Sequence, residues 1–178
     1  MNGVGRRKID SITIGFSTTD KLISKIIRWI TGSKISHAWI GYYDETLGQR
    51  MVLQAEAWGY ETRPWTRWIK QNKWVAEFIV PGRDKAKLAL QNIATFLGVK
   101  YDYGAAFLLG FRRWFGRWIK LPYRNPGKLM CTEAVVKFLK IGGYPVADDL
   151  DLELTEPDVL WNKVLGDKEF IKMLPPKV

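Results

Sequence analysis

The segment that decides the fold is Cys131-Thr132-Glu133-Ala134-Val135-Val136-Lys137-Phe138-Leu139. Its apolar positions Val135, Val136, Phe138 and Leu139 predict a buried helix, and Gly142-Gly143 supplies the end of that helix. Cys131 therefore lies at a predicted helix N-terminus. Backbone N–H groups without helical partners lower the pKa of a thiol at such a position, which favours the reactive thiolate.

Strands are predicted ahead of this helix in the chain. The run His37-Ala38-Trp39-Ile40-Gly41-Tyr42-Tyr43 is typical of a strand, and a polar turn at residues 44–49 separates it from a hairpin partner, Met51–Glu56. Another strand is expected from about Trp74 to Val80, before Pro81-Gly82. Together with the helices, these strands predict an α+β fold with a small antiparallel sheet packed against helices.

Further helices are predicted from capping residues and apolar spacing. One begins after Thr18-Thr19-Asp20, another is capped by Asp84 and runs to Gly98, and a third begins at Thr155-Glu156-Pro157-Asp158. We expect one domain over residues 1–178, with residues 1–10 as a basic N-terminal tail. Residues 105–126 form a basic, aromatic-rich insertion to which no element is assigned.

Length and hydropathy exclude several classes of protein. A chain of 178 residues with 47% hydrophobic residues has enough apolar material for one core. No apolar run reaches the roughly 18 to 20 residues of a membrane-spanning helix, and no apolar signal region follows the basic N-terminus. We therefore expect a monomer made in the cytoplasm without signal peptide or membrane span, which acts at the cell envelope if it is phage-encoded.

The formal net charge of +10 predicts attraction to an anionic partner. Nucleic acid, a membrane surface and an anionic cell-wall polymer all satisfy this condition. No helix-turn-helix, zinc or RNA-binding motif is present, and Lys and Arg are spread along the chain, so no specific nucleic acid is predicted. A non-enzymatic, basic nucleic-acid-binding module stays open as an alternative.

The chain contains one cysteine, Cys131, and one histidine, His37. A thiolate nucleophile needs a nearby imidazole, so the fold would have to bring these two residues together. The alternative is a buried thiol and a structural histidine, each without a catalytic role. One Cys and one His do not predict a metal site, and neither a P-loop nor a dinucleotide fingerprint is present, so no cofactor is expected.

Four motifs in order resemble the circularly permuted NlpC/P60 papain-like cysteine hydrolases, which include YiiX-like and YaeF-like amidases and, more distantly, lecithin retinol acyltransferase. The motifs are Thr31-Gly32-Ser33-Lys34-Ile35-Ser36-His37-Ala38-Trp39-Ile40-Gly41, Gln54-Ala55-Glu56-Ala57-Trp58-Gly59, Tyr101-Asp102-Tyr103-Gly104 and Cys131-Thr132-Glu133-Ala134-Val135-Val136. Histidine precedes cysteine, as in the permuted branch. The resemblance runs from about Ile12 to Leu160 and implies a permuted papain-like fold.

The resemblance also implies the site residues. Cys131 matches the nucleophile and His37 the base, while the residue that orients the imidazole matches Gln54 or Glu56. These two positions share one face of a strand, and Glu56 is favoured because a carboxylate also stabilises an imidazolium. Tyr101 matches a tyrosine that is expected near the nucleophile, where its hydroxyl could help to bind an oxyanion.

The implied activity is that of a thiol-dependent amidase or peptidase, which forms a thioester and acts on acyl or peptide substrates such as bacterial cell-wall peptides. A lipid-directed esterase or acyltransferase at a membrane surface is the enzymatic alternative, because residues 107–120 mix cationic and large apolar side chains. The sequence does not distinguish these acyl acceptors.

Overall fold

The computed structural model describes residues 11–20, 24–25, 28–29, 32–56, 58–102, 128–152 and 154–173. The expected basic tail, residues 1–10, and the basic aromatic insertion, residues 105–126, lie outside these ranges. Of the helix expected after Asp20, residues 24–25 and 28–29 are described, and they are helical.

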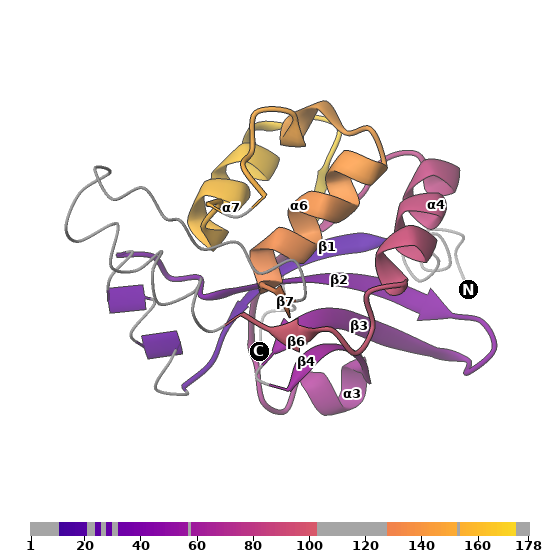
Figure 1. Cartoon of the computed structure of the whole chain (residues 1–178), viewed down its shortest axis with the longest axis horizontal. Helices are drawn as coiled ribbons and strands as arrows, with labels where there is room; N and C mark the ends of the chain where they lie inside the picture. Colours follow the sequence, from indigo (N-terminus) through magenta and orange to yellow (C-terminus); the bar gives the residue numbers. More distant parts are fainter. Residues whose placement is uncertain are drawn as a thin grey trace.

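Within the described ranges, one six-stranded sheet forms the centre of the molecule, in the order β4-β3-β2-β1-β5-β8 (Figure 1). Every neighbouring pair in this sheet is antiparallel. The α+β class and the antiparallel sheet are therefore confirmed, and the expected strands correspond to β2, β3 and β5. The strands are β1 (Thr13–Thr18), β2 (His37–Asp44), β3 (Gln49–Glu56), β4 (Gly59–Pro64), β5 (Lys73–Ile79) and β8 (Ile171–Met173).

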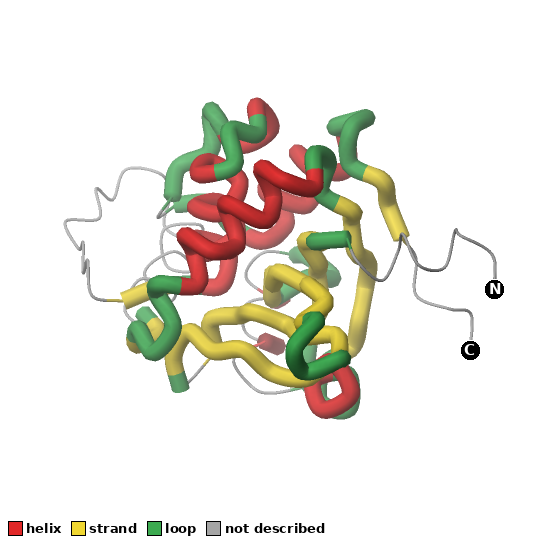
Figure 2. The backbone as a smooth tube through the Cα atoms, turned by 90° about the vertical axis from the view of Figure 1, so that its right-hand side faces the viewer, coloured by secondary structure: helices red, strands yellow, loops and turns green. Residues whose placement is uncertain are grey.

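Helices cover the two faces of this sheet unequally (Figures 1 and 2). One face carries α4 (Arg83–Ala94), α6 (Cys131–Ile141) and α7 (Pro157–Gly166), and the 3-10 helix η1 (Pro145–Ala147) follows α6. The single-turn helix α3 (Trp65–Trp68) packs on the side of β3 and β4 away from them. None of the helices in the described ranges is both long and apolar enough to cross a membrane.

The helix expected from Asp84 to Gly98 has different ends. Its N-cap is Gly82, whose φ of 70° turns the chain into the helix, so Asp84 lies in the first turn instead of capping it. The regular helix ends at Ala94, and residues 95–98 continue as turns. The predicted starts at Cys131 and Pro157 are confirmed, with Met130 and Glu156 as their N-caps.

Alternate residues of β2 point to opposite faces of the sheet, which places the site. Ala38 and Ile40 belong to the main core beneath the helices, whereas Trp39 packs with Val52 and Trp68 in a second, smaller cluster. His37 alternates with Ala38 and therefore lies on the face of this second cluster. We call Trp39, Trp65, Trp68 and Trp74 the tryptophan cluster, because each of their rings contacts at least one other ring of the set.

The tryptophan cluster requires a residue without a side chain on the neighbouring strand. Gly15 on β1 pairs with Trp39 on β2, and a Cβ atom at Gly15 would overlap the Trp39 ring. We expect Gly15→Ala to lower the free energy of unfolding by about 3 kcal/mol, as measured by urea denaturation. Gly166→Ala is the matched control, because a Cβ there meets nothing within 4 Å. Equal stability of the two variants would contradict this packing.

A separate two-stranded parallel sheet joins β6 (Lys100–Tyr101) to β7 (Lys128–Leu129). Tyr101 pairs with Leu129, and the backbone N–H of Asp102 donates to the carbonyl of Leu129 at 3.4 Å. Since Leu129 is followed by Met130 and Cys131, this pairing brings the segment around Tyr101 to the start of α6.

Candidate active site

The nucleophile candidate, Cys131, is the first residue of α6, whose N-terminus lies over the start of β2 (Figure 1). Met130 has an extended backbone, and its N–H donates to the Glu133 carboxylate at 3.2 Å. This contact identifies Glu133 as a capping residue of the helix. The Cys131 side chain is 6% exposed and belongs to the main core.

The environment of Cys131 favours its thiolate. Burial by itself opposes ionisation, but the hydrogen bond and charge of His37 outweigh it and lower the pKa of the Cys131 thiol below its ordinary value. The backbone N–H of Ala38 and the Thr132 hydroxyl, which lies 3.8 Å from Sγ, act in the same direction. The thiol is therefore surrounded by groups that stabilise its negative charge.

The environment of His37 favours the protonated ring. Its side chain is buried, which opposes a positive charge, yet the hydrogen bond and charge of Cys131 raise the pKa of His37 above its ordinary value. The charge of Glu56 and the hydrogen bond to Gln54 add to this rise. Both pKa directions favour a thiolate paired with an imidazolium, the reactive state of a cysteine nucleophile.

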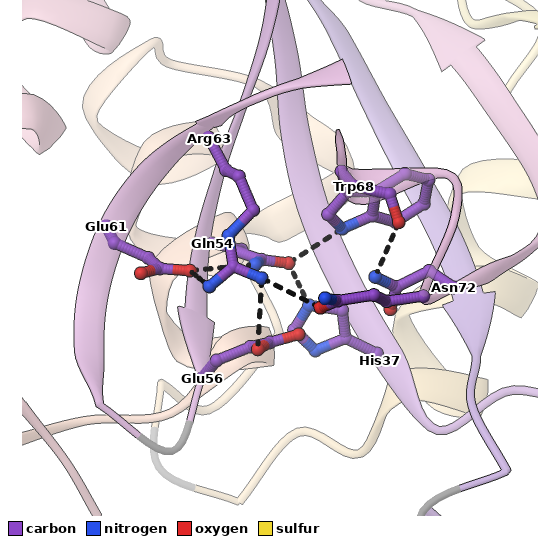
Figure 3. Close-up of polar contacts among 8 residues, drawn as sticks. His37, Gln54, Glu56, Glu61, Arg63, Trp68 and Asn72 are labelled. Atoms are coloured by element: carbon purple, nitrogen blue, oxygen red, sulfur yellow. Dashed lines mark hydrogen bonds and ion pairs between the residues drawn. The ribbon is translucent and has the colours of Figure 1, made fainter. Parts of the chain in front are cut away.

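Besides Cys131, His37 has a hydrogen-bond partner in Gln54 on β3 (Figure 3). Oε1 of Gln54 lies 2.9 Å from Nε2 of His37, and it also accepts a hydrogen bond from Nε1 of Trp68 at 2.8 Å. Nε2 of Gln54 donates to the Glu61 carboxylate at 3.2 Å. The Gln54 side chain is 1% exposed, so these bonds form away from bulk water.

These contacts determine which ring nitrogen of His37 carries the proton that faces Gln54. An indole nitrogen only donates, whereas an ionised carboxylate only accepts, so the Gln54 oxygen must face Trp68 and its nitrogen must face Glu61. The oxygen can then only accept from His37, which requires a proton on Nε2 of the ring. Nδ1 is left as the ring nitrogen for the hydrogen bond between His37 and Cys131.

Glu56, the favoured orienting residue, occupies a different place. Its Oε2 atom lies 4.0 Å from Nη1 of Arg63, and Nη2 of Arg63 lies 2.5 Å from Oε1 of Glu61 (Figure 3). Glu56 influences His37 through its charge, while Gln54 makes the direct contact. Gln54 thus makes a hydrogen bond to the ring and Glu56 acts on it through charge, and which of the two orients His37 for catalysis stays a prediction.

Tyr101 is half-buried and packs against the main core. Its backbone lies beside Leu129, near the start of α6, as the pairing of β6 with β7 requires. The role of its hydroxyl in binding an oxyanion stays a prediction.

Sequence reasoning missed three residues of this site: Glu61, Arg63 and Trp68. Glu61 and Arg63 lie on β4, a strand that was not predicted, and Glu61 is the direct cross-strand partner of Gln54. After Gly59 and Tyr60 the strand has three consecutive polar residues, Glu61-Thr62-Arg63, and ends at Pro64, so no alternation of polar and apolar residues signalled it. Trp68 follows Pro64 on a single helical turn too short to give a periodic pattern.

Comparison with known proteins does not assign the chain to a family: no family model matches the sequence, and no similar curated protein was found. Within the described ranges, no group of three or more His, Cys, Asp or Glu side chains is arranged to hold a metal ion.

Proposed function

We propose that the protein is a cysteine-dependent hydrolase with a permuted papain-like fold, in which Cys131 is the nucleophile and His37 the general base. One observation carries the proposal. A cysteine at a helix N-terminus has a lowered pKa because of a buried imidazole, and that imidazole is itself oriented by Gln54 at 2.9 Å. Nucleophile, base and orienting group are the three parts of such a site.

The reaction follows from these positions. Nδ1 of His37 takes the thiol proton, and the thiolate forms a bond to the carbonyl carbon of the substrate, which leaves a negative charge on the carbonyl oxygen. The first N–H groups of α6, which have no partner inside the helix, stabilise this oxyanion. The imidazolium then protonates the leaving amine or alcohol, and a thioester remains on Cys131.

Water completes the cycle. His37 removes a proton from a water molecule, the resulting hydroxide attacks the thioester, and the carbonyl–sulfur bond breaks to release a carboxylic acid. The thiolate leaves with its negative charge and His37 keeps the proton taken from water, so the thiolate–imidazolium pair is restored. If an amine or a lipid hydroxyl replaces water, the same site is an acyltransferase.

The substrate class that we propose is an amide or peptide bond in an anionic polymer such as a bacterial cell wall. The net charge of +10 supports this class, because it attracts a polyanion by long-range electrostatics. A lipid substrate is the second candidate, and one observation favours it. Trp58, two residues beyond Glu56, is 88% exposed, and exposed tryptophan is typical of proteins that contact a membrane interface.

The experiment that tests this function detects the acyl-enzyme. The protein is incubated with p-nitrophenyl acetate, quenched with acid and analysed by mass spectrometry, and we expect an acetyl group on Cys131. Cys131→Ala should carry no such group, whereas Lys140→Gln, at the exposed C-terminal end of the same helix, should be acylated like the parent. Absence of acylation in the parent protein would contradict the proposed function.

Substrate class is tested with the same three proteins. Purified peptidoglycan and vesicles of anionic phospholipid are offered in parallel, and the release of amines or of fatty acids is measured. Cys131-dependent release of amines from peptidoglycan supports the amidase. Release of fatty acids alone would overturn the polymer substrate in favour of the lipid one.

A further inference from the structure

Trp68 differs from its neighbours in the tryptophan cluster. Its indole N–H donates to Oε1 of Gln54 at 2.8 Å, on the atom that also binds His37. The buried indole N–H groups of Trp39 and Trp74 have no hydrogen-bond partner in the described part of the chain. Trp68 is thus the member of the cluster whose N–H is directed at the candidate active site.

The position of the Trp68 ring is determined by its surroundings. The ring centre lies 4.8 Å from that of Trp39 and 5.0 Å from that of Trp65, on which it stacks. Its backbone carbonyl accepts a hydrogen bond from the Asn72 side chain at 3.0 Å. The guanidinium group of Arg50 lies over the Trp65 ring, 4.1 Å from its centre. The indole N–H therefore has little freedom to move away from Gln54.

The alternative orientation of Gln54 is excluded by charge and by hydrogen bonding. If the amide flipped, its NH₂ group would face the Trp68 N–H, and its oxygen would face the Glu61 carboxylate. Both contacts would then be repulsive, and buried polar groups would be left without partners. Trp68 and Glu61 together select the orientation in which Oε1 of Gln54 accepts a hydrogen bond from His37.

We propose that Trp68 is a positioning residue of the candidate active site: its indole N–H holds the Gln54 amide so that His37 keeps its proton on Nε2 and presents Nδ1 to Cys131. The catalytic consequence of this inference rests on the proposed function. The positioning itself concerns only the contacts among Trp68, Gln54 and His37 and can be measured without a substrate.

The first experiment reads the tautomer of His37 directly. Because the chain has one histidine, ¹⁵N-labelled histidine gives a single ring in the NMR spectrum. In Cys131→Ala protein, at a pH where the ring is neutral, we expect the proton on Nε2. Introducing Trp68→Phe should increase the share of the Nδ1–H form, whereas Trp39→Phe, an equally buried tryptophan, should not. An unchanged tautomer in Trp68→Phe would overturn the proposal.

The second experiment separates positioning from packing by a double-mutant cycle. Trp68→Phe should slow the alkylation of Cys131 at pH 7 by about tenfold, because the buried Gln54 amide oxygen loses the hydrogen bond that the indole N–H donates to it. In a Gln54→Ala background the same substitution should have no further effect. An equal loss in both backgrounds would show that Trp68 acts only through packing, and would overturn the proposal.

Two outcomes remain informative if Trp68→Phe does not fold. Gln54→Leu in the Cys131→Ala chain should also abolish the preference for Nε2–H, and persistence of that preference would overturn the proposal. The failure of the proposed function looks different. If the parent chain shows no acylation at Cys131 while the tautomer shifts as expected, the enzyme assignment fails and the positioning role of Trp68 stands.

Discussion

Replacement of His37 by alanine is expected to slow the alkylation of Cys131 by iodoacetamide at pH 7 by about 30-fold or more, because an ordinary thiol is only a few per cent ionised at this pH. In the parent protein the imidazole lowers the pKa of the thiol against the opposing effect of burial. Without the ring, burial acts unopposed by an imidazolium, and the thiolate fraction falls. The rate is measured by mass spectrometry, which is unambiguous because the chain has one cysteine.

The same substitution should reduce any hydrolysis of an activated ester by a factor of about 10² to 10⁴, the usual contribution of a general base. Leu88→Ala, on the exposed side of α4, is the control, and it should react like the parent. Cooperative thermal unfolding of His37→Ala would show that its fold is intact. Alkylation of folded His37→Ala at the parent rate would mean that the imidazole does not activate the thiol.

Loss of Arg50 is expected to have the largest effect on stability. Arg50 on β3 forms an ion pair with Glu77 on β5, and the Glu77 side chain is 0% exposed. Arg50→Met leaves this carboxylate buried without its charged partner, which costs about 3 to 5 kcal/mol. The change also removes the guanidinium group from the face of Trp65. Urea denaturation should show this loss as a lower midpoint with an unchanged slope.

Two controls test the origin of that loss. Adding Glu77→Gln to Arg50→Met should recover part of the stability, because a buried amide costs less than a buried charge. Lys73→Met breaks the ion pair between Lys73 and Asp20, in which both side chains are more than half exposed, and should change stability by about 1 kcal/mol or less. A similarly small effect of Arg50→Met would contradict the importance of the buried pair.

Much of the site could be predicted because its parts have strong local signals. The helix that begins at Cys131 follows from its buried apolar residues, and the strand that begins at His37 follows from its composition. Gln54 and Glu56 were expected on one face of β3, and the structure places both near His37. The helix and the strand follow from local composition and periodicity, whereas Gln54 and Glu56 were expected as partners of His37 because of the family resemblance.

The choice between Gln54 and Glu56 could not be made from the sequence, because it depends on residues brought in by tertiary structure. Arg63 on β4 attracts Glu56, and Trp68 donates to Gln54. The partners of a side chain in a sheet are set by strand order and register, and neither was available for a strand that had not been recognised. The expected roles of residues 105–126 lie outside the described ranges and stay predictions.

The tryptophan cluster on the face of the sheet opposite the main core was also not predicted from the sequence. The sequence contains nine tryptophans, and four of them form a cluster separate from the main core. Their contacts join β2, α3 and β5, which are distant in the chain. The single-turn helix α3 supplies both the packing of this face and the hydrogen bond to Gln54.

The most direct test of the central claim is the pH dependence of Cys131 alkylation in the parent protein. We expect the rate to stay high to a lower pH than for an ordinary thiol, because the lowered pKa of Cys131 keeps the thiolate present until the pH falls through that pKa. The same protein unfolded in guanidinium chloride should follow an ordinary thiol with a pKa of about 8.5. A folded protein whose rate falls at the same pH as the unfolded one, or at a higher pH, would contradict the thiolate–imidazolium pair.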